Sequence, residues 1–173
     1  MNTILIGLGN PILTDDGVGV KVACAVEARL NGDRPPDLTI TEASVGGLRL
    51  MELLEGYDRA IIVDAIQTRG GNPPGTIYTL TLDDLRRISP TQHSASAHDT
   101  SLITALAAGR HLGMHLPQEI VIFAVEVENV LDFGEQPTPA VAAAIPRVVE
   151  MVLSVVSEQL SVTRHRVTRR TNT

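Results

Sequence analysis

Three polar groups in this chain lie next to apolar segments, where their side chains could do chemistry. Asp16 belongs to an aspartate pair ahead of an amphipathic stretch, Asp64 is predicted to end the apolar strand within RAIIVDAI (59–66), and His98 begins HDTSL. Two carboxylates and an imidazole suit a divalent transition metal and leave other coordination positions to water or substrate. These three residues are therefore the candidate metal-contacting and catalytic groups.

Each group also has a purely structural interpretation. One carboxylate of the Asp15–Asp16 pair could cap the helix that follows, and Asp64 could cap the next loop. A carboxylate at the end of an apolar strand is costly unless it is paired, capped or ligated. His98 could simply be solvated, as could His93 in the same loop. The metal interpretation depends on the three groups lying at one edge of the fold.

Hydrophobic periodicity predicts the elements that would position them. The expected strands cover 3–8, 38–41, 59–66, 75–82 and 119–125, and the expected helices cover 18–30, 47–56, a segment around 102–107 and 139–160, with a polar loop at 83–97. Alternating strands and helices predict an α/β fold, a three-layer sandwich with a twisted, mainly parallel sheet of about five strands and helices on both faces. Ligands of such sheets gather outside the carboxyl ends of the strands. Pro146 should kink or restart the last helix.

Length and composition predict one domain at 1–160 and a disordered, arginine-bearing tail at 161–173. Hydrophobic residues make up 43% of the chain, enough for a core without disulfides or a structural metal. The single cysteine, Cys24, lies in VKVACAVEARL and is predicted to be a small core residue.

Net charge and the pattern of apolar residues limit the partners and the cellular location that we expect. The net charge of −6 disfavours a nucleic-acid binder. The N-terminus enters an apolar strand without a leader-like basic region, and the uninterrupted apolar runs are too short to span a membrane. We expect a cytoplasmic protein that binds no membrane and acts as a monomer.

The glycine-rich segment GLGNPILTDDGVG (7–19) does not fit a nucleotide site. Ile12 stands where a dinucleotide fingerprint has its third glycine, and no GK[ST] follows. We therefore expect a tight strand-to-loop turn and no affinity for NAD, FAD or ATP. HExxH and GxSxG are also absent from the sequence.

Several segments, in order, resemble the endopeptidases that mature nickel–iron hydrogenases. They are GLGNPILTDDGVG, EASVGGLRLMELLEGYD (42–58), IIVDAI, HDTSL and AVEVENVLDFGEQPTPAV (124–141), and the resemblance extends to about residue 160. It implies an enzyme that clips a C-terminal extension from the hydrogenase large-subunit precursor after nickel insertion. The family's nickel-contacting acid, aspartate and histidine fall on Asp16, Asp64 and His98, and its acidic position ahead of the glycine loop falls near Glu42.

The resemblance also implies that nickel arrives with the substrate, and that other divalent metals can replace it. A metal-activated water and a carboxylate general base are both compatible with these residues. Two other functions stay open. One is a non-catalytic, metal-sensing or chaperone-like module that grips a hydrogenase subunit with the same residues. The other is a peptidyl-tRNA hydrolase, which also opens with GLGNP, although the TRHN-like segment expected there is missing.

Overall fold

The computed structural model describes residues 1–68, 70–88 and 99–170, with side chains at 1–68, 70–85, 87 and 102–158. Within these ranges five strands form one sheet in the order β2-β1-β3-β5-β4. The strands are β1 (Thr3–Leu8), β2 (Leu38–Ala43), β3 (Arg59–Ile66), β4 (Ile77–Thr81) and β5 (Glu119–Glu126). The helices are α1 (Val18–Leu30), α2 (Gly47–Leu54), α3 (Leu82–Ile88), α4 (Asp99–His111) and α5 (Pro139–Arg170), with a short 3-10 helix η1 (Thr14–Gly17).

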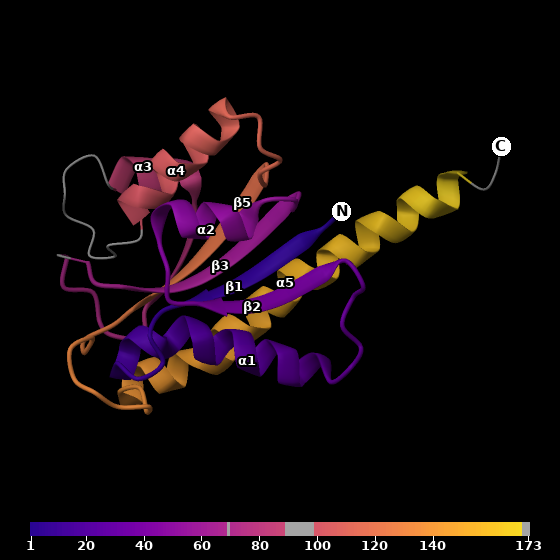
Figure 1. Ribbon diagram of the computed structural model, residues 1–173. Helices are drawn as coiled ribbons and strands as arrows, with labels where there is room; N and C mark the ends of the chain where they lie inside the picture. The colour runs from indigo at the N-terminus through magenta and orange to yellow at the C-terminus, as the bar shows by residue number, and fades with distance from the viewer. Residues whose placement is uncertain (69, 89–98, 171–173) are drawn as a thin grey trace.

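The sheet is parallel except at one edge. β1 pairs with β2 and β3, β3 pairs with β5, and only β4 runs antiparallel, at the edge beside β5. Helices cover both faces, with α1 and α5 on one side and α2, α3 and α4 on the other (Figure 1). The predicted three-layer α/β sandwich with a mainly parallel sheet is confirmed.

Strand alternation produces two cores, one on each face of the sheet. On β1, Ile4 and Ile6 contribute to the core beneath α2 and α4, whereas Leu5 contributes to the core beneath α1 and α5. All eight residues of β3 are buried because β3 is central and covered on both faces. A near-continuous apolar run is typical of such a strand, so the run that contains Asp64 marks the middle of the sheet.

A helix occupies part of the region for which we expected a polar loop. α3 begins directly after β4, where Thr81 N donates to Asp84 Oδ2 at 2.9 Å and Asp84 N donates to Thr81 Oγ1 at 3.2 Å. This reciprocal arrangement is a capping box, and it requires an acid or amide three residues after Ser or Thr. The loop prediction was therefore wrong for 83–88, and its remainder, 89–97, lies outside the described residues.

α5 is longer than the sequence suggests. It contains Pro146 without restarting there, and it continues to Arg170, so residues 161–170 are helical where we expected a disordered tail. Its segment Pro139–Glu158 is long and apolar enough to cross a membrane, by length and composition only. Uninterrupted apolar runs do not reveal this segment, because polar residues interrupt it. Val141 and Val148 on this segment are nonetheless fully buried in the core beneath α1 and α5, as in a core helix of a globular protein.

The glycines of GLGNPILTDDGVG let α1 lie directly on the strand ends. A Cβ on Gly19 would overlap the carbonyl oxygens of Leu8 and Val63, and a Cβ on Gly7 would overlap the carbonyl oxygen of Gly19. Gly9 turns the chain with a φ of +128°, a value that L side chains rarely adopt. Turn geometry and close packing therefore account for these glycines without a phosphate ligand.

Candidate functional site

Asp16 lies in η1, in the loop that leaves the carboxyl end of β1. Its side chain is half-buried, and its Oδ2 accepts a hydrogen bond from the backbone N of Asn10 at 2.7 Å. Asp16 N in turn donates to the carbonyl of Leu13 at 2.8 Å. The loop thus folds back on itself and fixes the position of this carboxylate. Its Oδ1 has no partner in the part of the chain that the structure describes.

Asp64 lies on β3, beside the last residue of β1. The last registered pair of these strands is Gly7 with Val63, so Asp64 stands one residue further, at the end of β1. Its side chain is only 5% exposed, and Oδ1 accepts from the backbone N of Ala65 at 2.9 Å. β3 itself continues to Ile66 because β5 goes on pairing with it, so Asp64 does not terminate the strand as we expected.

The structure therefore brings two of the three predicted residues to one edge of the sheet. Asp16 follows β1 and Asp64 lies on the neighbouring parallel strand, at the carboxyl edge of both. The third residue, His98, lies outside the described residues, as does His93. Within the described part of the chain, no three His, Cys, Asp or Glu side chains gather as a metal site. The three-residue metal set therefore stays a prediction.

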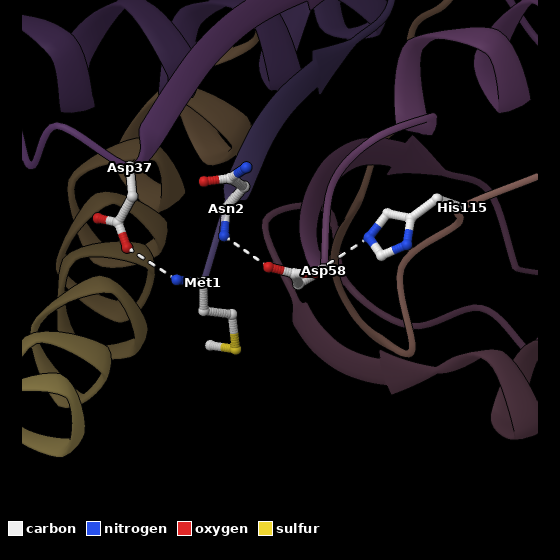
Figure 2. Close-up of polar contacts among 5 residues, drawn as sticks. All are labelled: Met1, Asn2, Asp37, Asp58 and His115. Atoms are coloured by element: carbon white, nitrogen blue, oxygen red, sulfur yellow. Dashed lines mark hydrogen bonds and ion pairs between the residues drawn. The ribbon is translucent and has the colours of Figure 1, made fainter. Parts of the chain in front are cut away.

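The two histidines whose side chains the structure describes, His111 and His115, lie at the opposite, amino edge of the sheet. His111 ends α4, and His115 follows it, ahead of β5. His115 Nε2 contacts Asp58 Oδ1 at 3.0 Å, close to where the chain enters β1 and β3 (Figure 2). The backbone N of Asn2 and then His115 hold the pKa of Asp58 below its ordinary value. These contacts anchor the amino edge and cannot supply a third ligand to Asp16 and Asp64.

Asp15 has a role that the sequence did not reveal. It is fully buried, and its carboxylate accepts from the backbone N of Asn129 at 3.0 Å and of Thr138 at 2.6 Å. It also accepts from Thr138 Oγ1 at 3.1 Å and Glu128 N at 3.3 Å. The sequence left open that one carboxylate of this pair caps α1, but the N-cap of α1 is Gly17, without a side-chain hydrogen bond. Asp15 instead ties the 127–138 loop, which leads into α5, to the loop that carries Asp16.

A second buried carboxylate was also missed. Glu126, at the end of β5, is 4% exposed and accepts from Thr68 N at 2.7 Å, Thr68 Oγ1 at 2.9 Å and Tyr78 Oη at 2.9 Å. Burial and this carboxylate raise the pKa of Tyr78. An acid in the apolar run EIVIFAVEV was the available signal. Its three hydrogen bonds hold the chain after β3 to β4 and β5, so Glu126 supports the carboxyl edge near Asp64.

Cys24 is not the core residue that we predicted, because it is exposed on α1. Its Sγ donates to Glu42 Oε1 at 2.8 Å. This hydrogen bond, with burial and the negative charges of Glu42 and Glu27, raises the pKa of the thiol to about 11. The thiol therefore stays protonated at neutral pH, and Glu42 is engaged with it.

The Glu42→Gln variant should make Cys24 react faster with iodoacetamide at pH 8. Losing the carboxylate lowers the thiol pKa from about 11 towards 9, which raises the thiolate fraction, while the weaker nucleophilicity of a less basic thiolate offsets part of the gain. We expect a net rate increase of about tenfold, measured by mass spectrometry over time. Glu27→Gln should change the rate less, because Glu27 acts only through space. Equal rates for wild type and Glu42→Gln would contradict this explanation.

Comparison with solved structures shows which class of protein has this fold. The hydrogenase maturating endopeptidase HybD from E. coli superposes with a TM-score of 0.75 at 28% identity, over 92% of this chain and 94% of that one. The fold is thus that of a hydrogenase maturation endopeptidase.

The sequence comparisons give the family. Residues 20–155 match the HycI family, described as hydrogenase maturation protease. The hydrogenase 2 maturation protease of Escherichia coli K12 is 30% identical over 158 residues, covering 91% of this chain and 92% of that protein. The hydrogenase expression/formation protein HupD of Rhizobium leguminosarum bv. viciae is 29% identical over 153 residues, covering 88% of this chain and 72% of HupD. The chain belongs to the hydrogenase maturation protease family and is a peptidase.

Proposed function

We propose that this protein removes the C-terminal extension of a nickel–iron hydrogenase large-subunit precursor after nickel insertion. In this proposal Asp16, Asp64 and His98 contact the nickel that the precursor carries, and the metal is part of the substrate. The observation that carries the proposal is the placement of Asp16, in the loop after β1, and Asp64, on the adjacent parallel strand β3, at the same carboxyl edge of the sheet, in a chain of this family.

The surroundings of the two carboxylates support a role in metal contact. Carboxylate oxygens are suitable ligands for divalent metals. Asp16 Oδ2 is fixed by Asn10 N, while Oδ1 has no partner among the described residues. Asp64 is nearly buried in an apolar strand, a placement that is costly for a carboxylate unless other groups compensate it. Both residues also lie at the carboxyl edge of parallel strands, where ligands of such sheets bind.

These residues offer two routes to hydrolysis. A carboxylate beside the scissile bond can take a proton from water as a general base, and nickel on the substrate can polarise the water that it binds. The buried position of Asp64 favours its role as an orienting ligand, whereas the half-buried Asp16 is accessible to water and substrate. We therefore assign Asp16 as the proton acceptor among the described residues.

Incubation with a nickel-loaded precursor tests the proposal directly. The purified protein should shorten the precursor by a single C-terminal peptide, which intact-mass measurement of both products would show. A precursor lacking nickel should stay uncut, because the metal would then be missing from the contact with Asp16 and Asp64. Stable binding of the loaded precursor without cleavage would contradict the proposal and favour a non-catalytic binding module.

A further inference from the structure

A groove of about 620 Å³ lies beside the candidate site, between α1 and two loops. Most of its lining is apolar, and its walls include Pro11, Ile12, Lys21, Cys24, Ala25 and Glu135. Its volume is within the range of about 300–1,000 Å³ that is usual for ligand-binding clefts. Lys21 is the only lysine of the chain, and it gives the groove one cation opposite the carboxylate of Glu135.

The groove is continuous with the Asp16 loop. Pro11 and Ile12 follow Asn10, whose backbone N holds the carboxylate of Asp16. A Cβ on Gly17 would lie 2.9 Å from the Cα of Pro11, so η1 packs directly against this wall. The opposite wall, with Glu135, belongs to the 127–138 loop that Asp15 holds through Asn129 and Thr138. Both walls are therefore fixed to the Asp15–Asp16 pair.

Large apolar side chains are exposed on the same two loops. Ile12 is 49% exposed, Leu131 84% and Phe133 83%. The loops are joined by hydrogen bonds from Gly134 N to the Ile12 carbonyl at 2.9 Å and from Thr14 N to the Gly134 carbonyl at 2.8 Å. Exposed apolar side chains on the loops that form the walls of a groove are typical of protein-binding surfaces. These hydrogen bonds hold the backbone of both loops, so the exposure of the three side chains is a property of the folded protein.

We infer that this groove binds the segment of the precursor next to the scissile bond, as an extended peptide with apolar side chains. This inference rests on the proposed function, because the substrate is identified as the occupant by the loop that carries Asp16, which forms one wall of the groove. Apolar side chains of the peptide fill the groove between Ile12 and Ala25, and Phe133 covers them from the rim. Lys21 pairs with a carboxylate of the peptide, and Glu135 pairs with a basic group.

Photocrosslinking from Cys24 locates the occupant. Cys24 is the only cysteine of the chain and lines the groove, so a benzophenone maleimide attached there reports on this surface alone. Illumination with nickel-loaded precursor should join Cys24 to precursor residues beside the cleavage position, identified by mass spectrometry of the digested product. Crosslinks to distant precursor residues or to a second copy of this chain, or none at all, would overturn the inference.

Kinetics of surface variants separate groove binding from catalysis. Ile12→Asp and Phe133→Asp should each lower kcat/KM for the precursor by about tenfold or more, mainly through KM, because they place a charge where apolar side chains bind. Leu112→Asp is the matched control, since Leu112 is 78% exposed at the amino edge, and it should match wild type. Lys21→Ala, which removes the cation without altering either loop, should also raise KM.

Circular dichroism and thermal unfolding of each variant confirm that the fold is intact. If wild type cleaves and all three groove variants keep its KM, the groove inference is wrong while the proposed function stands. If wild type does not cleave at all, the proposed function fails, and the Cys24 crosslink alone then decides whether the precursor occupies the groove.

Discussion

Asp16→Ala, Asp64→Asn and His98→Ala should each abolish precursor processing while the protein stays folded. Loss of one metal contact should lower the rate by at least about a hundredfold, since even residues that merely orient metal ligands cost about 10–100-fold. Asparagine is the better replacement at position 64, because Asp64 is 5% exposed and alanine would leave a cavity. Gel shift and intact mass measure cleavage, and circular dichroism checks the fold.

His93→Ala is the matched control for this series. His93 precedes α4 in the same stretch as His98 but does not adjoin its first residue, Asp99. We expect His93→Ala to process the precursor at the wild-type rate. If His93→Ala is inactive while His98→Ala is active, His93 rather than His98 is the histidine that contacts the nickel. Wild-type rates for all three site variants would show that the carboxyl edge is not the site.

Asp15→Ala should cause a large loss of stability. The carboxylate is fully buried and accepts four hydrogen bonds, two of them from Thr138. Its removal leaves four part-buried donors without an acceptor. A fully buried unpaired donor costs about 1–3 kcal/mol, and part-burial places these near the lower end of that range, so we expect about 3 kcal/mol in total. For a domain of this size the melting midpoint should fall by about 6–12 °C, as measured by circular dichroism.

Asp16→Ala provides the comparison for Asp15→Ala. Asp16 is half-buried and accepts a single described hydrogen bond, from Asn10 N, so its loss should shift the midpoint by no more than about 4 °C. This difference would show that Asp15 stabilises the loops, whereas Asp16 contributes little to stability and is available for the reaction. Equal midpoints for the two variants would contradict the assignment of Asp15 as the tie between the loops.

The sequence could predict the sheet and the edge where the two carboxylates lie. Apolar residues that are continuous, or that alternate with polar ones, predict β1, β3 and β5. The carboxyl ends of parallel strands lie at the same edge of a sheet. These rules predict that Asp16 and Asp64 lie at the same edge of the sheet, and the structure places both there. The position of Cys24 could also have been predicted, since Val18, Val22 and Val26 mark the inward face of α1. Cys24 lies about 200° from Val22 around the helix, on the outward face.

The role of Asp15 could not be read from the sequence in the same way. Its partners Asn129 and Thr138 lie 114 and 123 residues further along the chain. Periodicity reports only on the local environment of a segment, so it cannot indicate which distant backbone groups meet a buried carboxylate. The same limit applies to Glu126, whose partner Thr68 is 58 residues away. The α3 helix differs, because its capping box joins Thr81 to Asp84, three residues apart, and is a local signal that a sequence can show.

The buried carboxylate of Asp15 has a consequence for molecular recognition. It joins the two loops that form the groove walls within the free protein, through Asn129 and Thr138. The conformational entropy of ordering these loops is therefore lost when the chain folds, before any peptide arrives. A preorganised surface of this kind binds without an ordering cost of its own. The affinity for a flexible protein tail is then limited mainly by the entropy that the tail itself loses.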